Sequence, residues 1–375
     1  MAKKKRMELA NGSEASTKNI SKAKSEPEQE TPDVSKAIPK LKTAYGKTIP
    51  PISKMVGYVK SAVIGQDEPV TSVITAIYRS ICMNIKDVIL VIGGTGTGKS
   101  EILKQIANKM GVPYTVEDST EYTKAGYVGA NVQDIIEHLV VSAGYNFDKA
   151  QYGCIFLDEI DKKVSTNKED IAGTEVLKSL LKFVEGKKMI LNTYMEEEGE
   201  VFPAEVEFDT SHLTIVFSGA FEGLDKIRDK RLKKNVLGFS SYSENEQSNR
   251  YTKKDLVEYG MPEEFVGRIS TIVELNKLSE DDLVQILKRS RISILKTYKN
   301  ELKKMGITYV KIYEQVYKEI ASEAMKLGTG ARELNNVVNY VFEKIVFDVL
   351  NSRGKFTKCE LYEGIVLDNT KYKLS

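Results

Sequence analysis

Residues 92–100 read Ile-Gly-Gly-Thr-Gly-Thr-Gly-Lys-Ser. The apolar run Val-Ile-Leu-Val at 88–91 precedes this stretch, and a helix-like run follows it at 101–107. A buried strand, a glycine-rich loop ending in Lys-Ser and a helix together form the context of a P-loop, in which backbone N–H groups surround phosphates at a helix N-terminus. The stretch therefore predicts a nucleoside triphosphate site at the end of a strand.

Each residue type in the loop has a chemical reason to be there. Glycines let the backbone approach phosphate oxygens closely. The lysine reaches the β- and γ-phosphates, and the serine hydroxyl ligates Mg²⁺. The predicted nucleotide-binding residues of the loop are Gly93, Gly94, Thr95, Gly96, Thr97, Gly98, Lys99 and Ser100.

A second apolar run ends in carboxylates. Residues 155–159 read Ile-Phe-Leu-Asp-Glu. At such a strand end in a P-loop enzyme, Asp158 holds Mg²⁺ through water, and Glu159 orients or activates the attacking water. Glu159 therefore predicts hydrolysis of the nucleotide, rather than binding alone.

Composition is that of an ordinary globular protein. The chain has 375 residues, 41% of them apolar and 29% charged, with a net charge of +2. This balance gives no global electrostatic argument for a nucleic acid or a membrane as partner. No stretch is apolar enough to span a bilayer, and no apolar region follows the basic residues 1–6, which excludes a secretory signal.

The cysteines favour a reduced, cytoplasmic protein. Cys82, Cys154 and Cys359 are isolated in the sequence, and the histidines are His138 and His212. This spacing predicts neither a zinc site nor a disulfide framework. Cys154 lies in an apolar run and is expected to be a small core residue.

The length suggests about two domains. Residues 1–48 are rich in Lys, Ser, Glu, Pro and Thr, so we expect a disordered tail. From residue 49, strand-like runs alternate with helix-period segments, which predicts a parallel sheet covered by helices. The runs lie at 88–92, 154–157 and 213–217, and the helical segments include 132–142 and 174–184.

A second region is expected to begin at residue 276. Ser279 and the three acidic residues after it have the form of a helix-capping box. Helical periodicity then runs through 286–305, 316–326 and 334–350. We therefore predict a large domain at 49–275 and a smaller, mostly helical domain at 276–375.

Seven segments together resemble the ClpX family of AAA+ unfoldases: 93–100, 125–129, 148–151, 157–162, 218–221, 262–268 and 330–332. The match runs in order from about residue 63 to 350. The resemblance implies an α/β fold of the AAA+ P-loop class, with a parallel-sheet large domain and a small, mostly helical α+β domain. It further implies an ATP- and Mg²⁺-dependent unfoldase that forms a homo-hexameric ring, threads unfolded or tagged proteins through a pore and delivers them to the ClpP peptidase.

Several further site residues follow from the same resemblance. Arg268 resembles the arginine finger that reaches the ATP of a neighbouring subunit, and Arg332 resembles the sensor-2 arginine. Ser218 stands where sensor 1 is expected, although Thr214 or a neighbour can also serve. Val63 and Ile64 resemble residues that flank the adenine base.

Two loops are assigned to protein partners. Gly126, Tyr127, Val128 and Gly129 resemble the pore loop, in which an aromatic ring between flexible glycines grips substrate. Leu237, Gly238 and Phe239 lie in a polar stretch and resemble the tripeptide that docks into ClpP.

The sequence departs from the family in two places. The family begins with a four-cysteine zinc-binding domain, whereas no cysteine precedes Cys82 here, so we expect neither that domain nor zinc. The family also carries a basic Arg-Lys-His cluster at the pore entrance, where residues 195–200 here read Met-Glu-Glu-Glu-Gly-Glu. The reversed charge predicts a different choice of substrate tails.

The sequence supports three alternative functions less well. A remodelling chaperone without a protease is disfavoured by the tripeptide at 237–239. A nucleic-acid motor or clamp-loader-like switch would place basic patches at the pore, where Tyr127 and an acidic loop stand instead. The related ring ATPase HslU has a long extra domain before sensor 1, for which the roughly fifty-five residues between Leu157 and Leu213 leave no room. We therefore expect neither a nucleic acid nor a membrane as partner.

Overall fold

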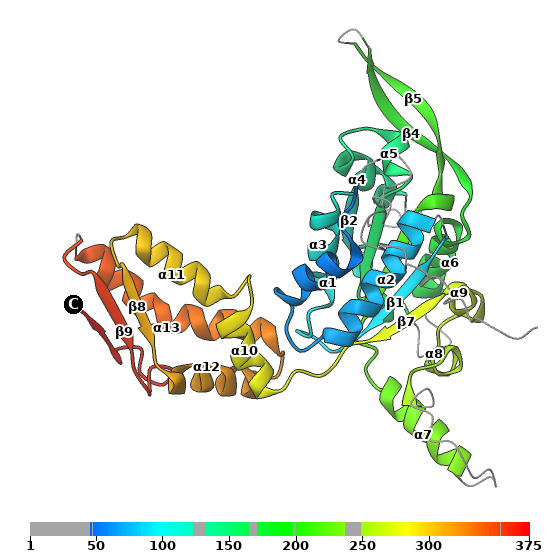
Figure 1. The fold of residues 1–375 in the computed structure, drawn as a ribbon. Helices are drawn as coiled ribbons and strands as arrows, with labels where there is room; N and C mark the ends of the chain where they lie inside the picture. The colour runs from blue at the N-terminus through cyan, green and yellow to red at the C-terminus, as the bar shows by residue number, and fades with distance from the viewer. Residues whose placement is uncertain are drawn as a thin grey trace, which may run out of the picture. The chain divides into compact units, whose positions relative to one another are not determined.

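The glycine-rich loop follows β1 (Val88–Ile92), a fully buried strand of a parallel sheet (Figure 1). The computed structural model describes residues 46, 48–83, 85–122, 133–164, 171–197, 200–236, 249–352 and 354–375, without the side chains of 171, 172, 174, 192–197, 200–203 and 234–236. Within these residues the sheet has the order β2-β3-β6-β1-β7, and all neighbours are parallel. The other strands are β2 (Tyr114–Asp118), β3 (Cys154–Asp158), β6 (Thr214–Gly219) and β7 (Thr271–Glu274).

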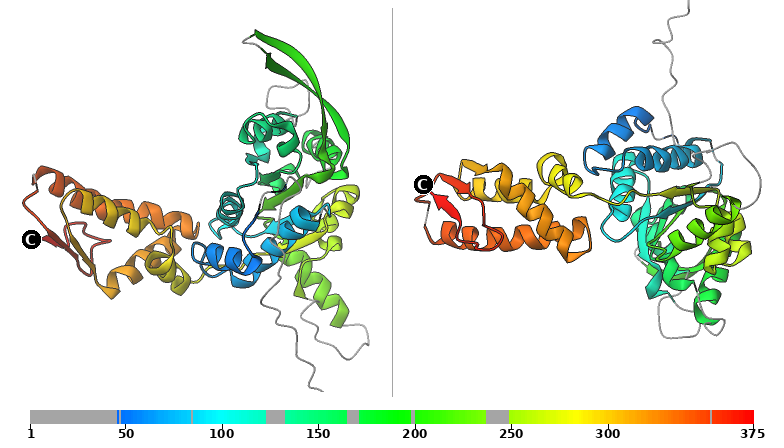
Figure 2. Two further views of the ribbon diagram at one scale, coloured as in Figure 1. Left: turned by 45° about the horizontal axis from the view of Figure 1, so that its top comes forward. Right: turned by 90° about the horizontal axis from the view of Figure 1, so that it is seen from below.

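Alternation along the strands builds one core on each face of the sheet. Ile89 and Val91 pack in the core formed with α1, α2 and α3, whereas Leu90 and Ile92 pack in the core formed with α4, α6, α8 and α9. Figure 2 shows these helices on the two sides of the sheet. The helices are α1 (Ile52–Lys60), α2 (Asp67–Met83), α3 (Lys99–Met110), α4 (Asp134–Ser142), α6 (Ile171–Glu185), α8 (Lys253–Tyr259) and α9 (Glu263–Arg268).

The predicted strands agree closely with the structure, because a parallel strand buried on both faces is a continuous apolar run. The run at 213–217 begins one residue early, since Leu213 ends the 3₁₀ turn Thr210–His212 and β6 starts at Thr214. Cys154 is a buried core residue, as predicted. Two further elements are an antiparallel hairpin of β4 (Lys188–Glu197) with β5 (Glu200–Asp209) and the short helix α5 (Phe147–Ala150).

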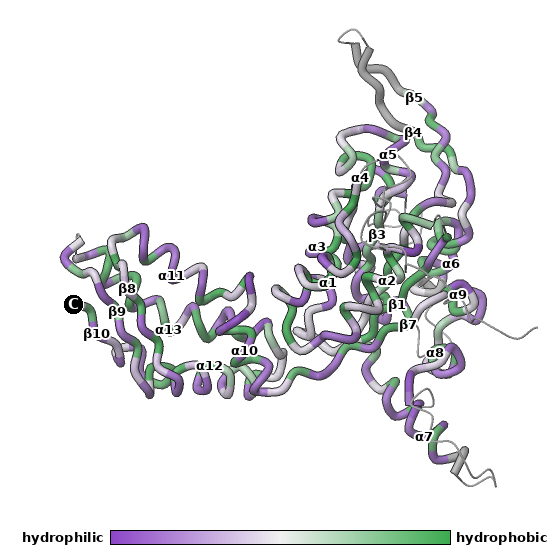
Figure 3. Tube along the Cα trace, in the orientation of Figure 1, coloured by the Kyte–Doolittle hydropathy of each residue, from purple (hydrophilic) through white to green (hydrophobic). Residues whose placement is uncertain are grey.

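Helix α7 (Leu224–Val236) differs from the sheet-covering helices in its polarity. Figure 3 shows largely hydrophilic residues along it, whereas the central strands are apolar. Short 3₁₀ turns follow two strand ends, at Ser119–Glu121 after β2 and at Ile160–Lys163 after β3. No described helix has both the length and the apolar character needed to cross a membrane.

Residues after 276 build a third core of their own, around α12 and α13. A small sheet of order β10-β9-β8 completes this region, with β8 and β9 parallel and β9 and β10 antiparallel. The elements are α10 (Glu280–Arg289), α11 (Ile294–Lys304), β8 (Tyr309–Ile312), α12 (Glu314–Leu327), α13 (Ala331–Asn351), β9 (Lys358–Leu361) and β10 (Tyr372–Leu374).

The predicted capping box is present, and one predicted helix is broken. Ser279 caps α10 through the amide of Asp282, whose carboxylate accepts from the Ser279 amide at 2.9 Å. The periodic run 286–305, however, is two helices with a turn between them. At this turn the Ser290 hydroxyl donates to the carbonyl of Ala62 at 2.6 Å, two residues beyond the end of α1.

Candidate nucleotide-binding site

The glycine-rich loop takes a conformation that its sequence makes possible. Gly96 and Gly98 have φ values of 76° and 101°, in the left-handed region that favours glycine. A Cβ atom on Gly96 would lie 2.0 Å from the carbonyl oxygen of Thr329, so a side chain is excluded there. Helix α3 begins at Lys99, and no side chain in the described part of the chain caps its N-terminus. The first N–H groups of α3 are therefore suited to an anion.

Lys99 lies inside the site among carboxylates. Its Nζ donates to the carbonyl oxygens of Gly93 at 2.7 Å and Gly94 at 3.2 Å. Burial lowers the pKa of the Lys99 amine, and the charges of Asp158 and Asp161 partly oppose this effect. The cation is thus placed beside the loop that the sequence assigned to phosphate binding.

Asp158, at the end of β3, brings three predicted residues together. Its carboxylate accepts from the hydroxyls of Ser100 and Ser218, each at 2.7 Å, and from the amide of Glu159 at 3.0 Å. Burial opposes ionisation, but these hydrogen bonds and Lys99 outweigh it and hold the pKa of Asp158 below its usual range. A hydroxyl and an ionised carboxylate side by side are oxygen ligands of the kind that Mg²⁺ prefers. The site residues therefore fit a magnesium nucleotide.

Glu159 has an unusual backbone conformation. Its φ of 57° and ψ of 31° are left-handed, a region that non-glycine residues rarely occupy. The carbonyl oxygen of Glu159 accepts a hydrogen bond from the Ser119 hydroxyl at 2.7 Å. Strained residues of this kind persist where the surroundings fix them and are frequent at functional sites.

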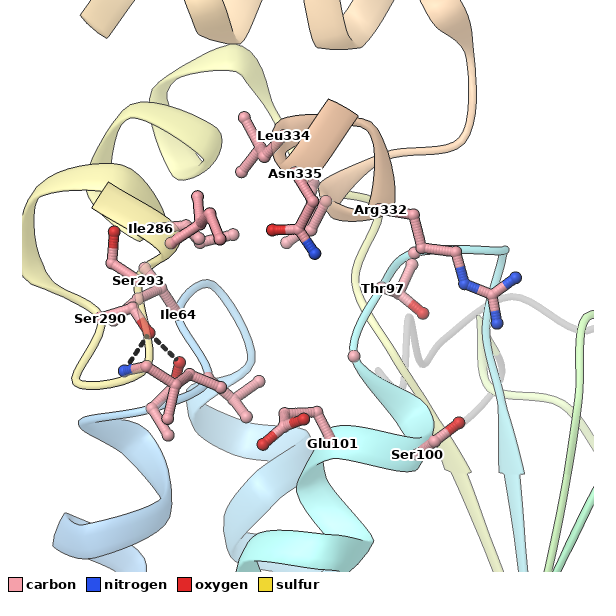
Figure 4. A pocket seen from close by; sticks show the side chains of 18 of the residues that line it. Ile64, Thr97, Ser100, Glu101, Ile286, Ser290, Ser293, Arg332, Leu334 and Asn335 are labelled. Atoms are coloured by element: carbon pink, nitrogen blue, oxygen red, sulfur yellow. Dashed lines mark hydrogen bonds between the residues drawn. The ribbon is translucent and has the colours of Figure 1, made fainter. Parts of the chain in front are cut away.

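A cavity of about 380 Å³ opens beside the loop, between the sheet region and the C-terminal region. Figure 4 shows Ile64 on one wall and Ile286 and Leu334 on the opposite wall. Val63, which the sequence assigned to the base together with Ile64, also lines it. An apolar cleft next to a phosphate loop suits the flat face of a base.

Sequence reasoning missed the C-terminal wall and one buried polar residue. Ile286, Leu334 and the polar Asn335 come from α10 and α13, in segments for which the sequence predicted only helical periodicity. Gln66 is fully buried, and its amide donates to the carbonyl oxygens of Thr97 at 3.3 Å and Asn276 at 2.8 Å. Gln66 ends the segment 63–66 that resembles the family's adenine-contacting segment, but only its apolar side chains were assigned to the base.

The two predicted arginines lie in different places. Arg332 is the second residue of α13 and lines the cavity, near Thr97 in Figure 4. Arg268 ends α9 and is absent from the described residues that line the cavity. Its guanidinium, 53% exposed, lies 3.1 Å from the carboxylate of Glu185.

The two loops assigned to protein partners fall outside the described residues. These are the pore-loop residues Gly126, Tyr127, Val128 and Gly129, and the docking residues Leu237, Gly238 and Phe239. Their roles stay predictions from the sequence.

Three features define a P-loop ATPase with an α/β fold. They are a phosphate-binding loop after β1, an acidic pair where β3 ends, and a serine near the end of the adjacent β6. The family model described as AAA domain (Cdc48 subfamily) matches residues 85–272. The ATP-dependent Clp protease ATP-binding subunit ClpX 2 of Wolinella succinogenes is 31% identical over 294 residues, which cover 76% of this chain and 72% of that protein.

The ClpX subunit of Borrelia duttonii is 32% identical over 280 residues, or 72% of this chain. The match spans 64% of that relative, slightly less than two thirds of its length. This chain therefore belongs to the ClpX family of AAA ATPases. The resemblance drawn from the sequence motifs is confirmed.

Proposed function

We propose that this chain is an ATP-dependent unfoldase that forms a homo-hexameric ring, threads proteins through its pore and delivers them to a ClpP peptidase. The relatives support this proposal, since both are named as ATP-binding subunits of a Clp protease. The structural observation that carries it is the cavity between two separate cores, with the phosphate loop on one side and Arg332 on the other. Binding at such a cavity acts on both regions at once.

The chain's own groups have clear tasks in hydrolysis. Lys99 and the first amides of α3 would bind the phosphates, and Ser100 and Asp158 would hold Mg²⁺. Ser218 fixes the Asp158 carboxylate through a 2.7 Å hydrogen bond. Glu159 accepts a proton from the attacking water at its carboxylate. Bound Mg²⁺-ATP supplies the phosphoanhydride bond that is hydrolysed.

Arg268 supports an assembly in which subunits complete each other's sites. It lies on the surface, away from the described lining of its own cavity. An arginine supplied by a neighbour is worth about 10³–10⁵ in hydrolysis rate. We also propose a cytoplasmic location, and protein rather than nucleic acid as substrate, on the grounds given from the sequence.

The deciding experiment follows a folded fluorescent reporter incubated with the purified chain, ATP and a ClpP ring. Fluorescence reports unfolding, and fragments on a gel report proteolysis. Phe239→Ala is compared with wild type and with Tyr242→Ala, an aromatic substitution in the same segment outside the tripeptide. We expect fragments with wild type and Tyr242→Ala but not with Phe239→Ala.

Two results would change this proposal. Equal loss of fluorescence in all three proteins without fragments would favour a remodelling chaperone that works without a protease. Undiminished fluorescence with wild type, despite ATP hydrolysis, would overturn the unfoldase proposal itself.

A further inference from the structure

The turns that follow β2 and β3 lie side by side because of the sheet register. Asp118 pairs with Asp158 at the ends of these parallel strands, so Ser119 and Glu159 leave the sheet at the same edge. Each chain then enters a 3₁₀ turn, Ser119–Glu121 in one case and Ile160–Lys163 in the other. The turn that carries Glu159 therefore has a direct neighbour outside the nucleotide cavity.

Three hydrogen bonds join the two turns. The buried Ser119 hydroxyl donates to the carbonyl of Glu159 at 2.7 Å. In the opposite direction, the ammonium group of Lys163 donates to the carbonyls of Thr120 at 3.2 Å and Tyr122 at 2.9 Å. We call Ser119 and Lys163 the bridge. Because its bonds are to backbone atoms, a shift in the Glu159 peptide moves the main chain of the neighbouring turn.

The far end of that turn is also held. Tyr122 is 1% exposed, and its hydroxyl donates to the carboxylate of Glu117 at 2.5 Å. The Glu117 carboxylate also receives the Thr115 hydroxyl and lies 3.0 Å from Nδ1 of His138 on α4. Residues 119–122 are thus fixed by buried contacts at both ends, which makes this short segment suited to transmit a displacement rather than absorb it.

One hydrogen bond of the bridge ends on the carbonyl of Glu159, one of the described non-glycine residues with a positive φ. Glu159 holds a left-handed conformation, and such a residue changes its peptide orientation readily when the contacts that fix it change. Its amide donates to Asp158, the carboxylate that fits Mg²⁺. A change at Asp158 during the nucleotide cycle is therefore passed to the Glu159 carbonyl and on to Ser119.

We propose that Ser119 and Lys163 are positioning residues that couple the Asp158–Glu159 turn to the chain leaving Tyr122. This inference rests on the proposed function, in which Tyr127, five residues further along the sequence, grips the substrate. The bridge acts on neither the nucleotide nor the substrate directly. When the bridge is removed, ATP hydrolysis continues but drives less protein unfolding.

The test uses the full chain with Lys163→Met and Ser119→Ala, both of which remove bridge hydrogen bonds at nearly constant size. Lys162→Met is the matched control, because Lys162 is the exposed neighbouring lysine. Lys163→Arg keeps a cationic donor and serves as the conservative variant. The measurements are basal ATP hydrolysis, reporter unfolding, and hydrogen exchange of the peptide covering 114–122 with ATP and with ADP.

We expect basal hydrolysis within about twofold of wild type and reporter unfolding about tenfold slower, the scale of one lost hydrogen bond to a charged group. More ATP is then consumed per reporter unfolded, and Lys163→Arg restores the ratio. Equal losses of hydrolysis and unfolding, or bridge variants that match Lys162→Met, would overturn the coupling.

Hydrogen exchange tests the bridge independently of the proposed unfolding activity. If wild type hydrolyses ATP but unfolds nothing, the unfoldase proposal fails, and the exchange data alone decide on the bridge. A difference between ATP and ADP at 114–122 that both bridge variants lose supports the coupling. No such difference in wild type rules it out.

Discussion

Glu159 and Asp158 are adjacent carboxylates with different surroundings. Asp158 receives three hydrogen bonds that favour its ionised form. The backbone of Glu159 is instead turned into the left-handed region, where its carbonyl is held by Ser119. The hydrogen bonds on Asp158 suit this carboxylate to holding a metal ion, because they favour its charged form.

Glu159→Gln should therefore stop chemistry while preserving binding. We expect hydrolysis to fall about 10²–10⁴-fold, the usual worth of a positioned base, because the amide cannot accept the proton. Affinity for ATP should stay near the wild-type value, since Lys99, Ser100 and Asp158 are untouched. Phosphate release and titration with a fluorescent ATP analogue measure the two quantities.

Glu121→Gln is the control for this substitution, as it alters an exposed carboxylate on the neighbouring 3₁₀ turn. It should leave both quantities unchanged. Turnover retained by Glu159→Gln would assign the proton to another group.

Elements that the sequence predicts well are those whose burial is decided locally. The strands β1 and β3 are apolar at every position that faces a core. They can therefore be predicted from the sequence without knowing which elements pack against them. The capping box at Ser279 is equally local. By contrast, the break between α10 and α11 depends on Ser290 meeting Ala62, which is more than two hundred residues away. The buried roles of Gln66 and Ser119 were missed for the same reason.

Lys86 is a second element-scale feature that the sequence did not indicate. Its ammonium group donates to the carbonyls of Phe183 and Thr210, each at 2.6 Å, and so joins the end of α6 to the turn before β6. These contacts lie on either side of the β4–β5 hairpin. Burial lowers the pKa of Lys86 to about 8, although Asp209 opposes the shift.

The lowered pKa predicts a specific dependence of stability on pH. An unfolded lysine titrates near 10.5, so between pH 8 and 10.5 the unfolded chain binds more protons at this residue than the folded chain. The contribution of Lys86 to the free energy of unfolding should thus rise through that window, by about 3 kcal/mol. Below pH 8 it should be constant.

Urea denaturation of wild type and Lys86→Met from pH 7 to 10.5 checks this expectation. The difference between their free energies of unfolding should grow above pH 8. Lys54→Met alters an exposed lysine and should run parallel to wild type. Parallel curves for Lys86→Met as well would mean that Lys86 keeps an ordinary pKa.

The β4–β5 hairpin carries Glu196, Glu197 and Glu200 at the ends of its two strands, where Glu197 pairs with Glu200. If this tip lines the pore entrance, like charges should weaken capture of tails that end in a free carboxylate. We expect a reporter with an Ala-Ala tail to be unfolded about tenfold more slowly than one with a Lys-rich tail. Charge reversal by Glu196→Lys with Glu197→Lys should reduce the difference between the unfolding rates of the two reporters. Faster unfolding of the Ala-Ala reporter by wild type would contradict the hypothesis.

At the scale of the whole molecule, the nucleotide cavity is where the C-terminal region meets the sheet region. The amide of Ala331 donates to the carbonyl of Gly96 at 3.2 Å, and Gln66 joins Thr97 to Asn276. The phosphate loop therefore contacts the start of α13 directly. A displacement of this loop would therefore act on the C-terminal region through these hydrogen bonds.

The exposed position of Arg268 leads to a prediction about an assembly of several subunits. In a ring with head-to-tail interfaces, each site faces a different surface of its neighbour, so a subunit can donate Arg268 to one site while using another subunit's arginine. Arg268→Ala should lower hydrolysis about 10³-fold or more. Glu159→Gln should be inactive because its amide cannot accept the proton. Mixed in equal amounts, the two inactive proteins should recover about one quarter of wild-type activity, because one interface in four then joins an intact Glu159 to an intact Arg268.

The control for this mixing experiment replaces Glu159→Gln by the double variant Glu159→Gln with Arg268→Ala, which offers no arginine and should restore nothing. Glu185→Gln tests the ion pair of Arg268 separately, since a purely structural role would make it as damaging as Arg268→Ala. If ATP hydrolysis recovers in the first mixture but not in the control mixture, Arg268 acts in the neighbour's site. If the first mixture recovers no activity although mixed rings form, Arg268 serves only its own subunit. If Arg268→Ala by itself hydrolyses ATP normally, Arg268 has no role in hydrolysis.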